Sequence, residues 1–309
     1  MRLCRYLRND LIRFGIVSDQ DSVIPIDDAA RSSRVDLPHV DSLLDLLPRG
    51  ASGELAEEIA SKLTSDSFAE LGEPLGSLRL LTPLASPRKL FLLAGNYAKH
   101  VIERGGQAEE RQRTFPYVFM KPPSTLTNPG DPIHIPRISP DEIDWEVELG
   151  VIIGKRCRHV TEDEALSAVA GYTVVNDISD RAFRPNPGRA KRERDAFFDW
   201  LHGKWHDTFC PIGPTVLSAE ACPDPQSLKL KLRVNGTIEQ DGSTAEMVFP
   251  VAAIIAFLSS MTTLEPGDII STGTPDGVGK AKGKFLRAGD VVEAEIEKIG
   301  ILRNPVIAE

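Results

Sequence analysis

Acidic residues alternate with apolar ones in the segment DWEVELGVIIG, residues 144–154. Successive side chains of a strand point to opposite faces, so Asp144, Glu146 and Glu148 share one face while apolar residues continue the other. Beyond Glu148 both faces are apolar, which favours partial burial of the acids. Two carboxylates about 4 Å apart repel by ~4 kcal/mol at an effective dielectric of about 20, and a cation removes that repulsion. The segment is therefore a candidate cation site, although alternation alone is more typical of a solvated strand face.

The segment VVEAEIEKIG, residues 291–300, carries the same alternation and serves as an internal control. No stretch with apolar residues on both faces follows its acids, and this pattern is typical of a strand with one face in water. A third carboxylate distinguishes the first segment, because Asp177 stands at the end of the apolar strand in AGYTVVND. Carboxylate-rich ligand sets favour Mg²⁺, Mn²⁺ or Ca²⁺ over zinc.

Five segments strengthen the hypothesis of a divalent-cation site, because in this order they resemble signature segments of the fumarylacetoacetate hydrolase family. They are DWEVELGVIIGK, AGYTVVNDIS, GKWHDTFCPIGP, LRVNGTIEQDG and LEPGDIISTGTPDGVG. The resemblance runs from about residue 88 to the C-terminus. It implies a catalytic domain of the family's mixed β-roll type, with Mg²⁺ or Mn²⁺ held by three acids. Glu146, Glu148 and Asp177 match those acids position by position.

The segment NYAKHVIERGG resembles the family's lid, in which a His and a Glu three residues later orient a water molecule. His100 and Glu103 match that pair. By spacing alone they are more typical of a surface pair worth a few tenths of a kcal/mol. A helix from Tyr97 to Arg104 is too short to be stable by itself, and Gly105-Gly106 ends it, so we expect an element that orders over bound ligand.

Three further residues match family segments that border the metal. Lys204 in GKWHDTF is the preferred cation for stabilising developing enolate charge, and Lys121 in FMKPPST is assigned to substrate binding. Thr274 in STGTPDGVG matches a loop residue that contacts the substrate carboxylate. Without the resemblance, a lone Lys is usually a solvated charge and a Gly/Pro-rich segment a turn.

The chain also departs from the family pattern. Where many members read N-D-x-S-A-R-D-x-Q, this chain reads NDISDRAFR: Arg181 is retained as a substrate-binding residue, but Asp180 and Ala182 replace Ala and Asp, and the Gln is missing. The following stretch is longer than in compact members and carries five basic residues between Arg184 and Arg194. A solvated loop is the usual explanation of such a run, and recruitment of a dianionic substrate is the weaker alternative.

The resemblance implies cleavage or rearrangement next to a 2-oxo acid. Our first hypothesis is metal-dependent hydrolysis of a C–C bond in an acylpyruvate-type compound, a reaction of aromatic compound breakdown. Isomerisation of a 2-hydroxyhepta-2,4-diene-1,7-dioate type compound and decarboxylation of an oxaloacetate type compound are the nearest alternatives, since all three share an enolate. A noncatalytic metal-dependent binder of 2-oxo acids is the remote alternative, against which His100, Glu103 and Lys204 argue.

Composition limits the remaining possibilities. The chain of 309 residues has a formal net charge of -9, which disfavours nucleic acid as a partner and favours small molecules. Its four cysteines form no C-x-x-C pair. No window approaches the ~18 uncharged apolar residues of a membrane span. We therefore expect a cytoplasmic protein with no membrane partner and free thiols.

The elements that must position these residues read as an α+β, β-rich fold. We predict a small β-rich N-terminal domain over residues 1–80, with a hairpin in RFGIVSDQDSVIPI, and a catalytic domain over residues 81–309. Thr161 and Glu164 form a capping box, and Gly171 suits the end of the helix that follows it. Asn235-Gly236 predicts a hairpin, and PVAAIIAFLSSM a buried helix. The resemblance alone implies a homodimer built through the catalytic domain.

Overall fold

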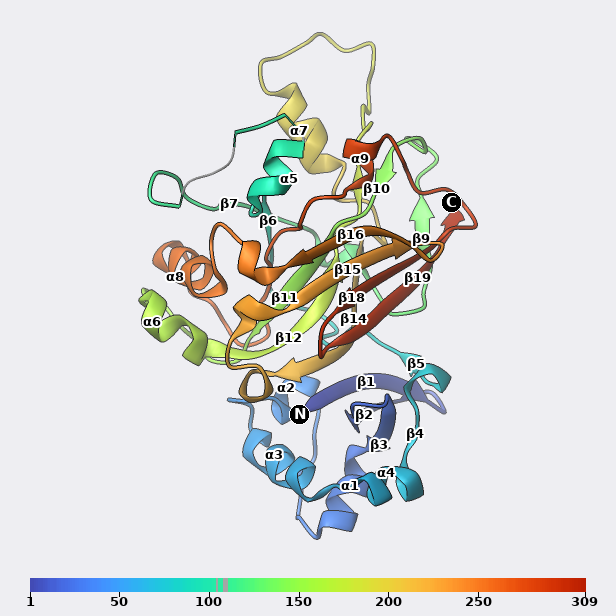
Figure 1. Ribbon diagram of the computed structural model, residues 1–309, viewed down its shortest axis with the longest axis vertical. Coiled ribbons are helices and arrows are strands. Elements are labelled where there is room, and N and C mark those ends of the chain that lie inside the picture. Colours follow the sequence, from blue (N-terminus) through green and yellow to red (C-terminus); the bar gives the residue numbers. More distant parts are fainter. Residues whose placement is uncertain (104, 108–110) are drawn as a thin grey trace.

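The computed structural model describes residues 1–103, 105–107 and 111–309 and confirms an α+β, β-rich fold (Figure 1). A long mixed sheet runs through the molecule in the order β4-β3-β2-β1-β14-β12-β11-β17-β6-β7, with β5 beside β1 and β8 beside β14. Its strands are β1 (Arg2–Arg8), β2 (Leu11–Val17), β3 (Ser22–Pro25), β4 (Glu73–Pro74), β5 (Arg79–Leu80), β6 (Leu90–Ala94), β7 (Tyr117–Met120), β8 (Leu126–Thr127), β11 (Val147–Ile153), β12 (Val169–Asn176), β14 (Cys210–Ser218) and β17 (Ile269–Ser271).

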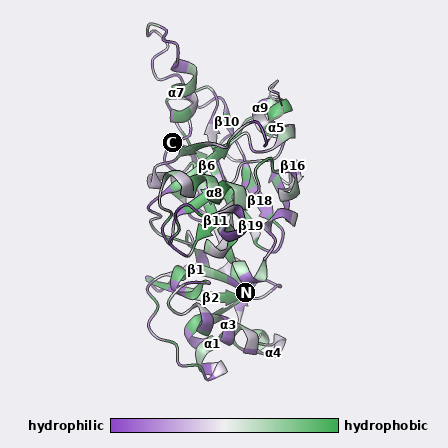
Figure 2. Cartoon of the chain, turned by 90° about the vertical axis from the view of Figure 1, so that its left-hand side faces the viewer, coloured by the Kyte–Doolittle hydropathy of each residue, from purple (hydrophilic) through white to green (hydrophobic). Residues whose placement is uncertain are grey.

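A second sheet in the order β16-β15-β18-β19-β9 packs against the central strands of the first. Its strands are β9 (Ile133–Ile135), β15 (Lys229–Val234), β16 (Thr237–Ser243), β18 (Val291–Ile296) and β19 (Gly300–Ala308), and a separate pair joins β10 (Ile143–Asp144) to β13 (Ser179–Asp180). One hydrophobic core contains Val147, Leu149 and Val151 of β11 together with apolar residues of β15, β18 and α8. Figure 2 shows the same concentration of hydrophobic residues at β6, β11 and α8.

Short helices cover the sheets and the two ends of the molecule. They are α1 (Ile26–Ser33), α2 (Leu43–Leu46), α3 (Gly53–Lys62), α4 (Ser65–Leu71), α5 (Ala98–Glu103), α6 (Glu162–Ala165), α7 (Asp195–His202), α8 (Val251–Met261) and α9 (Gly279–Lys282). In Figure 1 the first four lie around β1 to β4 at one end, while α5, α7 and α9 lie at the other. Among the described residues, no helix has the length and apolar character that a bilayer span requires.

The N-terminal segment continues the sheet of the larger part. Arg2 and Leu3 of β1 pair with Leu217 and Val216 of β14, and a second core contains Leu3 together with Ile152 and Val216. Strand pairing and apolar packing both extend across residue 80, so neither marks a boundary between two domains there. The predicted division at that residue stays a prediction.

Most of the local predictions are confirmed. The hairpin of β2 and β3 turns at residues 18–21, and Asn235-Gly236, both with positive φ, joins β15 to β16. The buried helix is α8, and the capping box of Thr161 and Glu164 begins α6. All four cysteines are buried free thiols.

Two local predictions are wrong. The acidic segment is two strands rather than one, because the chain breaks between β10 and β11 at Trp145 and Glu146. Gly171 does not end the helix, since α6 stops at Ala165 and Gly171 lies inside β12. A Cβ on Gly171 would lie 2.6 Å from the backbone oxygen of Leu217, so close strand packing explains this glycine.

We therefore expect Gly171→Ala to lower the free energy of unfolding by about 1–3 kcal/mol, the usual cost of forcing extra atoms into a packed core. Gly76→Ala is the matched control, because its Cβ would meet nothing within 4 Å and the position is exposed. Urea unfolding measures both. Equal stability of the two variants would contradict the packing explanation.

Candidate functional site

The three predicted carboxylates meet at the ends of two paired strands. The antiparallel register pairs Val147 of β11 with Asn176 of β12, so Asp177 follows directly beside Glu146. The amide of Asp177 donates to the Glu146 carbonyl at 2.9 Å. One oxygen from each of Glu146, Glu148 and Asp177 lies within 4.8 Å of the others, and all three residues are buried. The strand register therefore builds the cluster that the sequence predicts.

Burial distinguishes this strand from the control strand. Glu146 and Glu148 are 4% and 1% exposed, whereas Glu293 and Glu295 of β18 are half-buried and pair with Arg303 and Arg233 at the surface. The same alternation thus produces a solvated face in β18 and a buried acidic cluster at β11.

The buried acids have opposite electrostatic surroundings. Burial alone raises the pKa of Glu146, but Arg181 and Lys204 outweigh it and hold that pKa well below its usual range. Burial raises the pKa of Glu148 well above its usual range, and the nearby carboxylates of Asp177 and Glu146 raise it further. The Glu148 carboxyl accepts hydrogen bonds from Ser271 Oγ at 2.6 Å and from the Gly273 amide at 2.9 Å.

Two lysines lie against the carboxylates. Lys204 Nζ donates to Glu146 Oε2 at 2.7 Å and to Asp177 Oδ2. Burial lowers the pKa of Lys204, but Asp177 and Glu146 outweigh this and raise it. Lys121 Nζ pairs with Asp177 Oδ1 and donates to the carbonyls of Ile178 and Phe209 at 2.9 and 2.6 Å. Lys121 is buried and is not among the residues that line the cavity, so in this arrangement it supports Asp177 from behind, and its assignment to substrate stays a prediction.

Arg181 completes the ring of charge. Its Nε donates to Asp144 Oδ2 at 2.9 Å and its Nη2 donates to Glu146. The side chain is 3% exposed, and Nη1 is buried with no hydrogen-bond partner among the described residues. Arg181 also lines the cavity beside the acids, and an unpaired guanidinium N–H is a group that anionic ligands bind.

The donor set fits a hard divalent cation. Carboxylate oxygens are the ligands that Mg²⁺ and Mn²⁺ prefer. The cluster has four acids, counting Asp144, against three cations, which leaves one negative charge when Glu148 is ionised. A divalent cation changes this to one positive charge, which suits an anionic substrate.

The predicted lid pair lies over the acids. His100, 4% exposed, contacts Glu103 across α5 with 2.7 Å between Nδ1 and Oε1, and Glu103 Oε2 accepts from the Gly277 amide at 2.8 Å. His100 lines the same cavity as Glu146, Lys204 and Arg181. That cavity has a volume of about 20 Å³, room on the scale of a water molecule. A molecule larger than water would therefore enter only when α5 or other lining groups move. Arg104, at the predicted end of the lid helix, lies outside the described residues.

Thr274 lines the cavity, but its hydroxyl is already engaged. It donates to the Val147 carbonyl at 2.8 Å and accepts from Gln240 Nε2 at 2.8 Å. The hydroxyl hydrogen is thus committed to the protein, and a contact with substrate carboxylate through this hydroxyl stays a prediction.

Several residues at the site were missed by sequence reasoning. Ser271 and Gln240 bind the acidic strand and its loop, and the Asn176 side-chain oxygen accepts from the Glu146 amide at 3.0 Å. Trp200 of α7 lines the cavity, with its ring centroid 5.9 Å from Lys204 Nζ. The available signal was weak: Gln240 is one of several polar residues in β16, and Trp200 is one of three aromatic residues in the extended insertion.

The basic stretch folds back on α7. Arg189 pairs with both Asp195 and Asp199, Arg192 with Asp195 at 3.2 Å, and Arg184 lies 3.5 Å from Asp199. Asp199 is 4% exposed, so these contacts anchor the helix that carries Trp200. The stretch therefore has a structural role, and these three arginines are not among the residues that line the cavity.

The two departures from the family pattern lie beside the site. Asp180 accepts from Ser139 Oγ at 2.9 Å and from the Ala182 amide at 3.0 Å, and its other oxygen lies 3.4 Å from His206 Nε2. Asp180 thus links the segment that carries Arg181 to the segment that carries Lys204.

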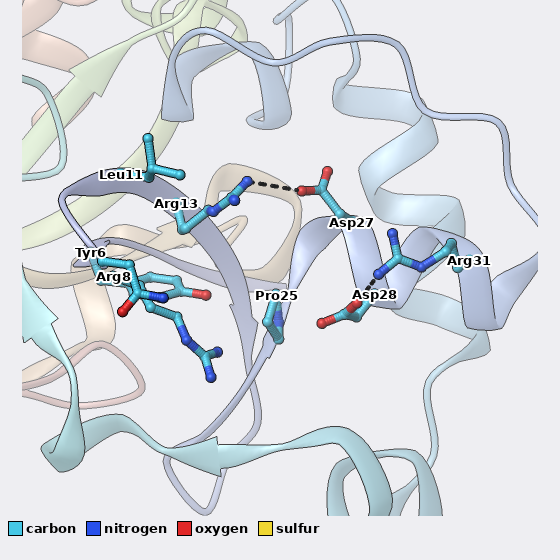
Figure 3. A pocket seen from close by; sticks show the side chains of 9 residues that line it. Tyr6, Arg8, Leu11, Arg13, Pro25, Asp27, Asp28 and Arg31 are labelled. Atoms are coloured by element: carbon cyan, nitrogen blue, oxygen red, sulfur yellow. Dashed lines mark hydrogen bonds and ion pairs between the residues drawn. The ribbon is translucent and has the colours of Figure 1, made fainter.

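A separate surface groove lies in the N-terminal part (Figure 3). It has a volume of about 460 Å³, but its arginines are paired with acids: Arg13 with Asp27, Arg31 with Asp28, and Arg8 with Glu73. Since the side chains of the three arginines and of the acids Asp27 and Asp28 are exposed, the groove has the character of a solvated surface, and none of the predicted site residues lines it.

Comparison with known proteins gives the geometry a context. Residues 89–307 match the model of the C-terminal domain of fumarylacetoacetate (FAA) hydrolase. The chain is 42% identical over 260 residues to a 2,4-didehydro-3-deoxy-L-rhamnonate hydrolase of Sphingomonas sp. (strain SKA58), covering 83% of this chain and 86% of that protein. It is 34% identical over 311 residues to the mitochondrial oxaloacetate tautomerase Fahd2a of Rattus norvegicus, covering 98% and 93%. Among solved structures, maleylpyruvate hydrolase from Sphingobium sp. SYK-6 in complex with manganese (II) ion and pyruvate superimposes with a TM-score of 0.73 at 30% identity, covering 100% and 99%.

We expect the buried acids to make stability depend on metal. Mg²⁺ or Mn²⁺ at about 100 times its Kd should raise the free energy of unfolding by about 2.7 kcal/mol, because the ion binds the folded chain preferentially, and EDTA should reverse the effect. Thermal unfolding with and without metal measures it.

Paired variants distinguish metal binding at the carboxylate cluster from metal binding to acidic side chains elsewhere on the protein. Glu148→Gln should abolish the metal effect, while Glu293→Gln, on the control strand, should leave it intact. Identical melting curves of the unaltered protein with and without metal would rule out the site.

Proposed function

The chain belongs to the fumarylacetoacetate hydrolase family of enzymes, and on that premise we propose that it is a divalent-metal-dependent hydrolase of an acylpyruvate-type 2-oxo acid, cleaving a C–C bond. One observation carries the proposal: Glu146 and Glu148 of the buried carboxylate cluster line one small cavity together with His100, whose imidazole is paired with Glu103. A binding protein would need the cluster but not a water-orienting pair.

The metal, Mg²⁺ or Mn²⁺, is proposed to be held by Glu146, Glu148 and Asp177. When bound, it would supply a Lewis acid for the carboxylate and 2-oxo oxygens of the substrate. The manganese and pyruvate bound by the Sphingobium relative support this choice of ion and substrate class. Arg181 Nη1, buried and unpaired among the described residues, would hold the substrate carboxylate.

His100 would act as the base. Because the Glu103 carboxylate accepts from Nδ1, the hydrogen of a neutral imidazole resides on Nδ1 and Nε2 is left free. Nε2 would take a proton from the attacking water, while Glu103 stabilises the imidazolium that forms. Lys204, buried between Glu146 and Asp177, would stabilise the charge that develops on the enolate leaving group.

A tautomerase or isomerase is the second candidate, favoured by the similarity to the rat oxaloacetate tautomerase over 98% of the chain. The same pair would then move a proton between carbon and oxygen without an attacking water. Decarboxylation of an oxaloacetate-type acid would use the same enolate. Turnover of acylpyruvates, oxaloacetate and hydroxydienedioates by the purified protein with Mg²⁺ distinguishes these reactions.

The lid pair gives a sharper test. We expect His100→Ala and Glu103→Gln to lower kcat by roughly 10²–10⁴-fold, the usual contribution of a positioned acid or base, with metal Kd nearly unchanged since neither residue is a proposed ligand. Steady-state kinetics and metal titration measure the two quantities. Lys99→Ala is the control, because Lys99 shares α5 but pairs at the surface with Glu246. If kcat survives in both lid variants, His100 and Glu103 have no place in the mechanism.

We also propose that the protein is a cytoplasmic homodimer. Large apolar side chains at the surface support self-association: Phe115, Tyr117 and Met120 are 60%, 61% and 43% exposed. Light scattering at micromolar concentration should give about twice the mass of the chain, whereas a 33.8 kDa particle would contradict the dimer.

A further inference from the structure

Gln240 is a buried amide next to, but outside, the cavity, and it bonds two segments of the site. It lies on β16, is 1% exposed, and makes three hydrogen bonds. Its Oε1 accepts from the Val147 amide at 3.0 Å, and its Nε2 donates to Thr274 Oγ1 and to the Pro275 carbonyl, both at 2.8 Å. The orientation of the amide is unambiguous, because an N–H group faces one end and a carbonyl faces the other.

The strand pattern explains why β16 presents this side chain. Ile238 pairs with Arg233 and Gln240 with Leu232, so β16 carries one extra residue, Glu239, opposite that step of β15. Such a bulge bends the strand and changes the direction of the side chains next to it.

Gln240 supplies bonds that no strand supplies at this position. On one side β11 pairs with β12 throughout, but on the other side β17 pairs only with Gly150 to Ile152. The Val147 amide is therefore bound by Gln240, and its carbonyl is bound by Thr274. Val147 stands between the proposed ligands Glu146 and Glu148, so these bonds fix the backbone from which both ligands extend.

The loop that Gln240 holds reaches both parts of the site. The Gly273 amide donates to Glu148 at 2.9 Å, and the Gly277 amide donates to Glu103 at 2.8 Å. Thr274 and Pro275, the two partners of Gln240, lie between these glycines. A shift of this loop would therefore move the support of a metal ligand and of the lid pair together.

We propose that Gln240 is a positioning residue that holds the metal-binding strand and the 271–277 loop in one arrangement, so that the carboxylate cluster and the His100-Glu103 pair stay in register. The inference deepens the proposed function and rests on it for the catalytic consequence alone. It requires no contact between Gln240 and substrate.

The experiment compares Gln240→Met, which keeps the length of the side chain and removes its three bonds, with Gln226→Met. Gln226 is a matched control: its amide also bonds three groups, the Thr244 carbonyl, Met247 Sδ and the Val251 amide, none of which lines the cavity. Hydrogen exchange of residues 271–279 and 98–103, the Kd for Mn²⁺, and kcat are measured on the full chain.

For Gln240→Met we expect faster exchange in both segments, weaker Mn²⁺ binding, and a kcat lower by about 10²-fold, the scale of a displacement of about 1 Å at a catalytic group. Gln226→Met should change exchange only near its own partners and leave kcat and Mn²⁺ binding unchanged. Unaltered exchange of residues 271–279 in Gln240→Met would overturn the proposal, as would equal effects of the two variants on that segment.

Gln240→Glu provides a second readout if the Met variant does not fold. It keeps the acceptor for the Val147 amide and loses the donors to Thr274 and Pro275, so exchange should rise in the 271–279 loop first. If the unaltered protein turns over no 2-oxo acid, the proposed function fails, whereas the exchange and Mn²⁺ data still decide the role of Gln240.

Discussion

The mutual repulsion of three buried carboxylates is the constraint on which this structure depends. Glu146, Glu148 and Asp177 present oxygens within 4.8 Å of one another in a region closed to solvent. An isolated buried charge costs several kcal/mol, so the fold has to supply compensation from elsewhere in the chain. It does so with Lys121, Arg181 and Lys204, which come from three separate segments and converge on the same acids.

This compensation is uneven, and the unevenness suits a metal site. Glu146 is paired with both Arg181 and Lys204, whereas Glu148 has hydrogen bonds from Ser271 and Gly273 but, within the part of the chain that the structure describes, no cation in contact. The position beside Glu148 is therefore the one at which a divalent ion would relieve most repulsion. Since Lys204 already bridges Glu146 and Asp177, ion and ammonium would share the same carboxylates, and the site is an extended charge network rather than three independent ligands.

The surrounding elements hold the side chains of this network in place. On one side β12 and Asn176 fix the acidic strand, and on the other Gln240 and the 271–277 loop take the place of a strand partner. The arginines of the insertion neutralise the acids of α7 and so hold Trp200 against Lys204. Away from the site, β1 pairs with β14 and continues the sheet into the N-terminal strands. Without β1, the long strand β14 would be an exposed edge of the sheet.

Local pattern was sufficient for the features that depend on neighbouring residues. The Asn235-Gly236 turn, the capping box at Thr161, the buried helix α8 and the alternation of β11 are all fixed by backbone preference and period. The resemblance of several segments in order predicted that Glu146, Glu148 and Asp177 belong to one site, and the structure brings them together. Tertiary structure alone decided the rest. The identical alternation at Glu146 and Glu293 ends buried in one case and solvated in the other, because burial depends on which sheet packs on which face. The same holds for Lys121 behind Asp177, for Thr274 with its hydroxyl engaged, and for Gln240 at the strand edge: each contact joins residues far apart in the chain, and no local spacing encodes the meeting of such residues.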